Sequence, residues 1–156
     1  MGFAKKVSAV VLPAGAIALG LVAAQGLESA QGIIKYRKSV MKSQAGHIGA
    51  IGAIAKGQVP FKQDLVAHAV ALRSTSKMIL EAFPEGSGTG DTRARPEIWT
   101  EWIKFEQAAR NFEKESEKLV QVAKSGDLEQ VSSQFLAVAK ACKGCHKPFR
   151  KKKKKK

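Results

Sequence analysis

Five consecutive residues near the C-terminal end combine side chains that can form thioethers and bind a metal: Cys142-Lys143-Gly144-Cys145-His146. Two thiols three positions apart, followed directly by an imidazole, form the pattern by which c-type haem is attached to proteins. Each thiol can add to one vinyl group of a porphyrin, and the imidazole can then bind the iron. The chain has two cysteines in all, so none is left for a structural bridge. The sequence therefore predicts one covalent haem c, held by Cys142 and Cys145, with His146 on the iron.

Three other chemistries are open to the same residues. A zinc site would need a fourth ligand, and the sequence has no second cluster of Cys and His to supply it. A thioredoxin-like pair would place its reactive thiolate at a helix N-terminus, whereas this motif falls in the last turns of an expected helix. A local disulfide would leave His146 without a role. Haem attachment explains all three side chains.

Residues 1–24 have the composition of a signal peptide. Two lysines precede a largely apolar stretch, 7–24, which ends in small residues and predicts cleavage after Ala24. The alternative is an uncleaved membrane anchor, since a stretch of this length could nearly span a bilayer. Pro13, Gly15 and the small residues at its end favour cleavage. We therefore expect export to the periplasm, with no membrane attachment after cleavage.

The mature chain, residues 25–156, has a size suited to one domain and is strongly basic. The whole sequence carries a formal charge of +14. Loss of the two leader lysines leaves 25 Lys and Arg against 13 Asp and Glu, a charge of +12, or about +10 if two haem propionates ionise. Residues 151–156 are all lysine and predict a disordered, solvated tail. Such charge can steer acidic redox partners or only solubilise the chain end. Nothing in the sequence resembles a nucleic-acid-binding module, so we expect no nucleic-acid partner.

Apolar residues recur at alternating spacings of three and four in four segments, which predicts four amphipathic helices. Turn signals separate them: Gly57 and Pro60, then Pro84 with a glycine-rich stretch, then Gly126. Short connections favour an all-α, up-down-up-down antiparallel four-helix bundle, in which 25–150 is the haem domain. The expected helices cover about 28–56, 61–82, 96–125 and 127–149.

The bundle topology predicts which side chains surround the macrocycle. The C-terminal end of the last helix, which carries His146, comes level with the N-terminal half of the first helix. It also comes level with the end of the second helix and the start of the third. We therefore expect Met41, Phe83 and either Trp99 or Trp102 around the haem.

The other two histidines are the remaining possible axial ligands. His47 follows Met41 by six residues, which rotates it about 240° around the helix and away from the haem-facing side. His68 lies beside the apolar stripe of the second helix and near the end remote from His146. We expect both at the protein surface, without a role at the iron.

The mature chain resembles the cytochrome c′ family, the class II c-type cytochromes, over essentially its whole length. The attachment motif alone indicates only haem c, but its C-terminal place and two internal motifs make the resemblance specific. The matching residues are Lys35-Tyr36-Arg37 followed by Met41, Lys56-Gly57-Gln58-Val59-Pro60-Phe61, Arg95-Pro96-Glu97-Ile98-Trp99, and Ala141-Cys142-Lys143-Gly144-Cys145-His146 with Arg150.

The resemblance implies roles for several of these residues. His146 would be the proximal ligand, and Met41 would cover the opposite face of the iron, where leucine is frequent in the family. Arg37 would lie near the haem propionates, and Arg150 beside the proximal imidazole. Family members are commonly homodimers through their first two helices, so a homodimer is expected.

The role of Met41 leaves two functions open. In high-spin members an apolar side chain packs over the iron without bonding it, and the five-coordinate iron binds NO and CO. Low-spin relatives use a methionine of the first helix as sixth ligand, which makes a His/Met electron carrier. The agreement elsewhere favours the first: a periplasmic electron-transfer haem protein that binds NO and CO, with Met41 as a non-ligating lid. The low-spin carrier is the alternative.

Two further classes of protein are less consistent with the sequence. A peroxidase needs distal acid and base groups to cleave an O–O bond. The first helix offers Met41 and Gln44 near the haem, not a His/Arg pair, so we expect no enzyme activity. A structural bundle without cofactor is the other possibility, and a colourless preparation would identify it.

Overall fold

The computed structural model describes the backbone of residues 18–152 and the side chains of residues 30–152. Most of the predicted signal peptide and most of the lysine tail lie outside these residues. Seven helical elements make up the described chain, and its one β-bridge joins Ala94 to Arg150. The elements are α1 (Ala18–Ala55), η1 (Lys62–Asp64), α2 (Leu65–Ser76), η2 (Leu80–Ala82), α3 (Glu97–Thr100), α4 (Trp102–Ser125) and α5 (Leu128–Phe149).

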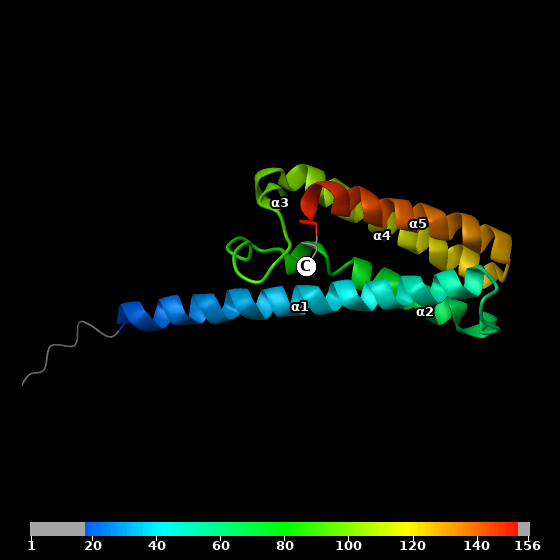
Figure 1. Cartoon of the computed structure of the whole chain (residues 1–156), viewed down its shortest axis with the longest axis horizontal. Coiled ribbons are helices and arrows are strands. Elements are labelled where there is room, and N and C mark those ends of the chain that lie inside the picture. Colours follow the sequence, from blue (N-terminus) through cyan, green and yellow to red (C-terminus); the bar gives the residue numbers. More distant parts are fainter. Residues whose placement is uncertain (1–17, 153–156) are drawn as a thin grey trace, which may run out of the picture.

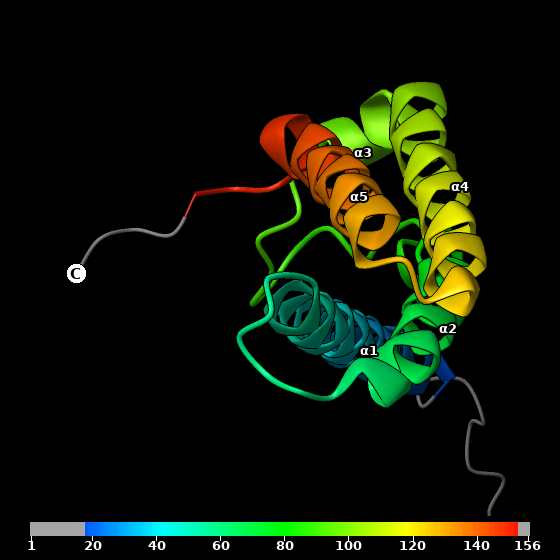
Figure 2. The ribbon, with the colours of Figure 1, turned by 90° about the vertical axis from the view of Figure 1, so that its right-hand side faces the viewer.

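The four long helices form the predicted bundle. In the end view they occupy four corners, with α1 next to α2 and α5, and α4 next to α2 and α5 (Figure 2). Successive long helices run in opposite directions. α1 and α2 make one layer, and α4 and α5 make the other (Figure 1). The all-α, antiparallel four-helix fold is confirmed. None of the described helices is long and apolar enough to cross a membrane.

The turn between α4 and α5 follows the local sequence closely. Gly126 adopts a positive φ of 72°, which glycine reaches without a steric penalty, and so ends α4. Asp127 then caps α5, because its carboxylate accepts hydrogen bonds from the backbone N–H groups of Glu129 (2.9 Å) and Gln130 (3.2 Å). The predicted start of the last helix is therefore confirmed.

The second predicted helix is too long. The α-helical conformation ends at Ser76, and the chain reaches Phe83 through a turn and η2. Thr75 Oγ1 donates to the carbonyl oxygens of Ala71 and Leu72, and Ser76 Oγ donates to that of Arg73. Hydroxyls that bond back to the preceding turn compete with the backbone hydrogen bonds of the helix, which favours an end there.

The third predicted helix is interrupted after one turn. Glu101 has φ −122° and ψ 43°, outside the helical region, so α3 ends before it and α4 begins after it. This break rotates Trp102 out of the apolar stripe and leaves the residue 36% exposed. The alternative that placed Trp102 at the macrocycle is wrong for this reason. Phe105, one turn on, is buried and resumes the stripe.

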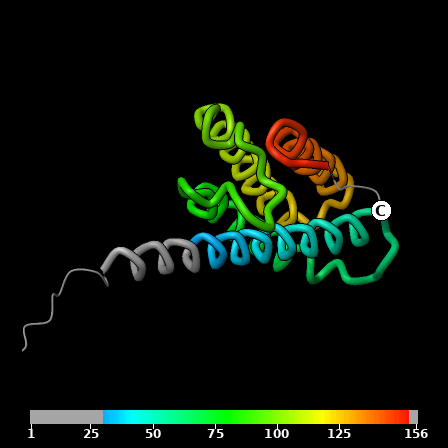
Figure 3. The backbone as a smooth tube through the Cα atoms, turned by 60° about the vertical axis from the view of Figure 1, so that its left-hand side comes forward, coloured from blue at the N-terminus to red at the C-terminus, as the bar shows by residue number. Residues whose placement is uncertain are grey.

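The two layers meet closely at one end of the bundle and diverge toward the other (Figures 1 and 3). At the closed end, a Cβ built on Gly52 of α1 would lie 2.9 Å from the ring of Phe135 of α5. Ser132 Oγ donates to the carbonyl oxygen of Ala55 in the same region (3.1 Å). The open end holds residues 37–45 of α1 and the C-terminal end of α5, which the predicted topology placed at one level.

Candidate functional site

A cavity of about 540 Å³ lies between the layers at the open end. This is the size of pocket that holds cofactors and small ligands in proteins. Its walls come from α1, from the segment between α2 and α3, and from α3, α4 and α5. Eight of the nine predicted site residues line it: Arg37, Met41, Gln44, Phe83, Cys142, Cys145, His146 and Arg150.

The two thiols lie on the inward face of α5. Burial raises the pKa of both Cys142 and Cys145 from 9.0 to about 11, and for Cys145 the neighbouring Cys142 adds to the effect. Both thiols therefore stay protonated at neutral pH. A reactive thioredoxin-like thiolate does not fit this environment, because such a thiolate needs a lowered pKa.

The His146 imidazole lines the same cavity and is partly buried. Its pKa lies below the usual 6.5, mainly because burial disfavours the charged ring and secondly because Arg150 and Arg93 repel the proton. A neutral imidazole keeps the lone pair that a metal ligand needs. The predicted place of Arg150 near this ring agrees with the structure.

Arg93 is a cavity residue that the sequence analysis missed. A short antiparallel pairing brings it there: Arg95 N donates to Phe149 O (3.1 Å), and Lys151 N donates to Arg93 O (2.8 Å). The Arg93 guanidinium also donates to Lys151 O, from Nε at 2.9 Å and from Nη2 at 2.6 Å. The loop has no helical periodicity that could have indicated this contact, which depends on the folded position of the end of α5.

Arg37 is buried, with 4% of its surface exposed, and its guanidinium is tied to the segment after α2. Nη1 donates to Ala82 O (3.2 Å) and to Ser87 Oγ (3.0 Å), and Nη2 donates to Ser87 O (3.0 Å) and Thr92 Oγ1 (2.8 Å). It also lies over the Phe83 ring, 4.5 Å from the centroid. Arg37 therefore fixes the loop that borders the cavity.

The uncharged residues of the α1 wall are Met41, Gln44 and Ala45. Gln44 donates an amide N–H to Thr75 O (3.0 Å), between α1 and the end of α2. Met41 is partly buried and packs against the hydrophobic core. Arg37 is also tied to protein acceptors, and Met41 is the larger of the two apolar side chains on this wall.

Trp99 does not line the cavity, contrary to its predicted place beside the macrocycle. Its indole N–H donates to Phe83 O and Pro84 O, both at 3.1 Å. Its ring lies against Gly88, where a built Cβ would be 2.9 Å from it. The break at Glu101 leaves α3 as a single turn, in which Ile98 faces the cavity and Trp99 holds the loop.

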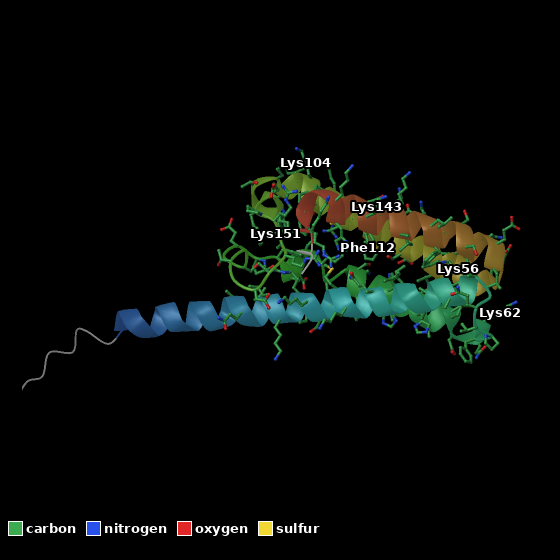
Figure 4. The ribbon with its side chains drawn as sticks, viewed as in Figure 1. Lys56, Lys62, Lys104, Phe112, Lys143 and Lys151 are labelled. Atoms are coloured by element: carbon green, nitrogen blue, oxygen red, sulfur yellow. The ribbon has the colours of Figure 1, made fainter. Side chains whose placement is uncertain are left out.

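Six apolar residues of the cavity were assigned to the core stripes rather than to the site: Ile79, Ile98, Phe105, Ala109, Phe112 and Phe149. Figure 4 shows Phe112 between the two layers, whereas Lys104 and Lys143 stand on the outer side. The cavity occupies the place of core packing at this end of the bundle. The helical periodicity that assigned these residues to the core therefore also identified residues of the cavity wall.

The charges around the cavity are all positive. Among the residues whose side chains are described, no carboxylate lines it, and burial together with Arg93 lowers the pKa of Arg150. Cavity cations other than Lys38, which pairs with Asp91, suit an anionic group such as the haem propionates. No cluster of three or more His, Cys, Asp or Glu that could hold a metal ion occurs within residues 30–152. The cationic lining residues are Arg37, Lys38, Lys42, Arg93 and Arg150.

His47 and His68 do not line the cavity, in agreement with their exclusion as axial ligands. Both rings are partly buried and keep part of their surface exposed. They face each other across the contact between α1 and α2, with their Nδ1 atoms 3.1 Å apart. Their spacing in the sequence gave no sign of this pairing.

The fold, the two thiols, the neutral imidazole and the cationic cavity define a c-type haem protein built on a four-helix bundle. The family model described as cytochrome c′ matches residues 32–150. The chain belongs to the cytochrome c′ family, and Cys142, Cys145 and His146 fit its haem c attachment motif.

Relatives and solved structures agree with this assignment. The cytochrome c′ of Rubrivivax gelatinosus is 38% identical over 121 residues, which cover 76% of this chain and 94% of the relative. A nitric oxide complex of a cytochrome c prime variant from Alcaligenes xylosoxidans superposes with a TM-score of 0.74 at 34% identity, covering 80% of this chain and 97% of the other. A carbon monoxide-bound variant of the same protein gives the same TM-score and identity, over 79% and 97%.

Proposed function

We propose that this protein is a periplasmic haem protein whose five-coordinate iron binds NO and CO and exchanges single electrons. The observation that carries the proposal is the α1 wall of the cavity. On this wall Arg37 and Gln44 donate to protein acceptors, Lys38 pairs with Asp91, and Met41 is the larger of the two apolar side chains, which suits it to cover the iron. Bound haem supplies an iron with an open coordination position and a one-electron redox couple.

In this proposal the residues of α5 hold the haem from the side of His146. Cys142 and Cys145 would form the thioethers, and His146, kept neutral by burial, would bind the iron. Arg37 and the other cations of the cavity would compensate the propionates. Arg150 would keep its place beside the proximal imidazole.

Met41, as an apolar cover over the iron, favours small neutral ligands. NO and CO lose little on leaving water, whereas an anion or a water molecule would be desolvated against a thioether, which donates no hydrogen bond. The NO and CO complexes of the Alcaligenes xylosoxidans variants support diatomic ligands for this chain also. Gln44 and the occupied Arg37 offer no acid and base pair for peroxide cleavage, so we propose no enzyme activity. We expect the protein to turn over peroxide no faster than free haem does, which a peroxide-turnover assay measures.

Met41 as a sixth ligand is the second candidate. The observation in its favour is that Met41 and His146 line the same cavity from facing helices, and a thioether is a known haem ligand. The protein would then be a low-spin His/Met electron carrier that does not bind gases.

An optical spectrum of the ferrous protein, with and without CO, separates the two. Five-coordinate iron gives a broad high-spin Soret band that shifts with CO, and Met41→Leu leaves this behaviour unchanged. A Met41 ligand gives sharp α and β bands without a CO response, and Met41→Leu then creates one. Met78→Leu is the matched control, because Met78 is 37% exposed and outside the cavity. Sharp bands that Met41→Leu converts to a CO-responsive high-spin spectrum would rule out the lid.

Haem attachment has its own test. The mass of the purified, exported protein should equal the chain from about Gln25 plus one haem, and Cys142→Ser with Cys145→Ser should remove the haem mass. The same measurement tests the signal peptide, since retention of residues 1–24 would point to the membrane anchor. A bare polypeptide mass for the native sequence would contradict the whole proposal.

Acidic redox proteins are the proposed electron-transfer partners, because the cavity is lined by cations and no carboxylate. We expect the association rate to fall steeply with salt.

A homodimer through α1 and α2 is proposed from the family resemblance, and the exposed side chains of Tyr36 and Val70 on these helices suit it. Light scattering over a range of protein concentrations tests the dimer.

A further inference from the structure

The His47–His68 pair takes no part in the haem cavity and lies at the contact between α1 and α2. Both rings are partly buried, their Nδ1 atoms are 3.1 Å apart, and their centroids are 5.4 Å apart with planes tilted by 52°. One ring nitrogen from each of the two helices therefore lies within hydrogen-bond distance of the other. Either one proton can lie between the two Nδ1 atoms, or both Nδ1 atoms can bind the same metal ion.

The separation of the two nitrogens has the value expected for two ligands of one ion. With metal–nitrogen bonds of about 2.05 Å, 3.1 Å between the nitrogens corresponds to an angle of about 100° at the metal. This lies between about 90° for neighbouring ligands of a square-planar ion and about 109° for a tetrahedral ion. The Nε2 atoms, one on each ring, are left to carry the ring protons.

We propose that His47 and His68 form a two-histidine site for a borderline divalent cation of the Cu²⁺ or Zn²⁺ type, which links α1 to α2. Imidazole nitrogen is a preferred ligand of these ions. No third His, Cys, Asp or Glu completes a cluster in the part of the chain whose side chains are described, so water would fill the other positions. Around His47 the surface is open, because a Cβ built on Gly46 or Gly49 meets nothing within 4 Å.

The composition of the chain makes the site testable. The sequence has three histidines and two cysteines, and haem attachment engages His146 and both thiols. His47 and His68 are therefore the remaining imidazoles of the holoprotein. The net positive charge of the chain opposes non-specific cation binding, so an observed affinity must come from coordination.

The experiment titrates the untagged ferric holoprotein with Cu²⁺, by calorimetry and by electron paramagnetic resonance. We expect one ion per chain and hyperfine structure from two nitrogens, with Zn²⁺ competing for the site. His47→Gln and His68→Gln should each weaken binding by about tenfold or more, because either variant leaves a single imidazole. The double variant should be little weaker than the single ones.

Tyr36→Phe is the control. It removes another contact between α1 and the segment after α2, from Tyr36 Oη to Met78 Sδ at 3.5 Å, and should bind Cu²⁺ as the native protein does. An unchanged haem spectrum shows that each variant keeps the site of the proposed function. Stoichiometric binding that survives both histidine substitutions, or a native spectrum without two nitrogen ligands, would overturn the metal site while leaving the haem proposal intact.

Discussion

The two ends of the bundle are held by different kinds of contact. At the closed end, small and apolar groups bring α1 and α5 together, with the ring of Phe135 against Gly52. At the open end, directional hydrogen bonds from Arg37 fix the loop after α2, and backbone pairing of residues 93–95 with 149–151 fixes the end of α5.

This difference shows how a small bundle keeps an internal space. Apolar contacts are non-directional and favour contraction until the interior is filled. Hydrogen bonds fix the distance between their partners, so those of Arg37 and of residues 93–95 with 149–151 set the positions of the cavity walls. Substitutions at the two ends should therefore differ in what they damage.

The largest expected effect is at the open end, in Arg37→Ala. Loss of the guanidinium leaves the buried acceptors at Ala82 and Ser87 without a donor and should lower the free energy of unfolding by about 3 kcal/mol. Urea denaturation followed by circular dichroism measures this, and the CO response reports on the cavity. Lys38→Ala is the control, because its ion pair with Asp91 is exposed and should contribute less than about 1 kcal/mol. Equal losses from both variants would contradict the role given to Arg37.

The second effect concerns the thiols before haem is attached. Burial raises the pKa of Cys142 and Cys145 from 9.0 to about 11, so the folded chain holds its thiol protons over a pH range where the unfolded chain has lost them. Alkylation of haem-free chain at pH 8 should be about tenfold to a hundredfold slower than in urea. The difference should fade above pH 11, where both states are ionised. Equal rates at pH 8 would show that the haem-free thiols are not buried.

The third effect compares two glycines of α1. Alanine at either position gains about 1 kcal/mol of helix propensity, but Gly52→Ala must also displace the Phe135 ring at a cost of about 1–3 kcal/mol. Gly49→Ala meets nothing within 4 Å and should stabilise the protein. We expect the two variants to differ by about 2 kcal/mol in thermal or urea unfolding, with unchanged haem spectra. Similar stability in both would mean that the closed end is not tightly packed.

The smallest effect is at the turn that joins α4 to α5. Hydrogen bonds from Gln130 and Glu129 hold the pKa of Asp127 below its usual 3.8. The cap is therefore present above that pH and weakens as the pH falls through the lower folded-state value. Asp127→Ala should lower the urea midpoint at pH 7, and Asp127→Asn should restore most of it. A midpoint for Asp127→Ala that matches the native protein at pH 7 would contradict the cap.

The sequence predicted the features that depend on periodicity and on short motifs. The inward faces of the helices, the Asp127 cap and the cavity residues Cys142 and His146 follow from local spacing, and Met41 follows from the bundle topology and the family resemblance. Features that depend on the folded loop escaped prediction. Arg93 reaches His146 through pairing with the chain end, and Trp99 leaves the cavity because Glu101 interrupts the helix.

The His47–His68 contact was missed for a related reason. Each histidine lies beside an apolar stripe, and the sequence does not set the relative rotation of α1 and α2. Only the packed pair of helices brings the two Nδ1 atoms together. Contacts between helices are in this sense less predictable than the face that each helix buries.

The position of the attachment motif in the chain has a consequence for biosynthesis. Residues 142–146 follow every other element that contributes a wall, since α1 and α4 come earlier in the sequence. The walls are therefore synthesised before the two thiols, and the last helix to be made is the one that carries the haem attachment motif.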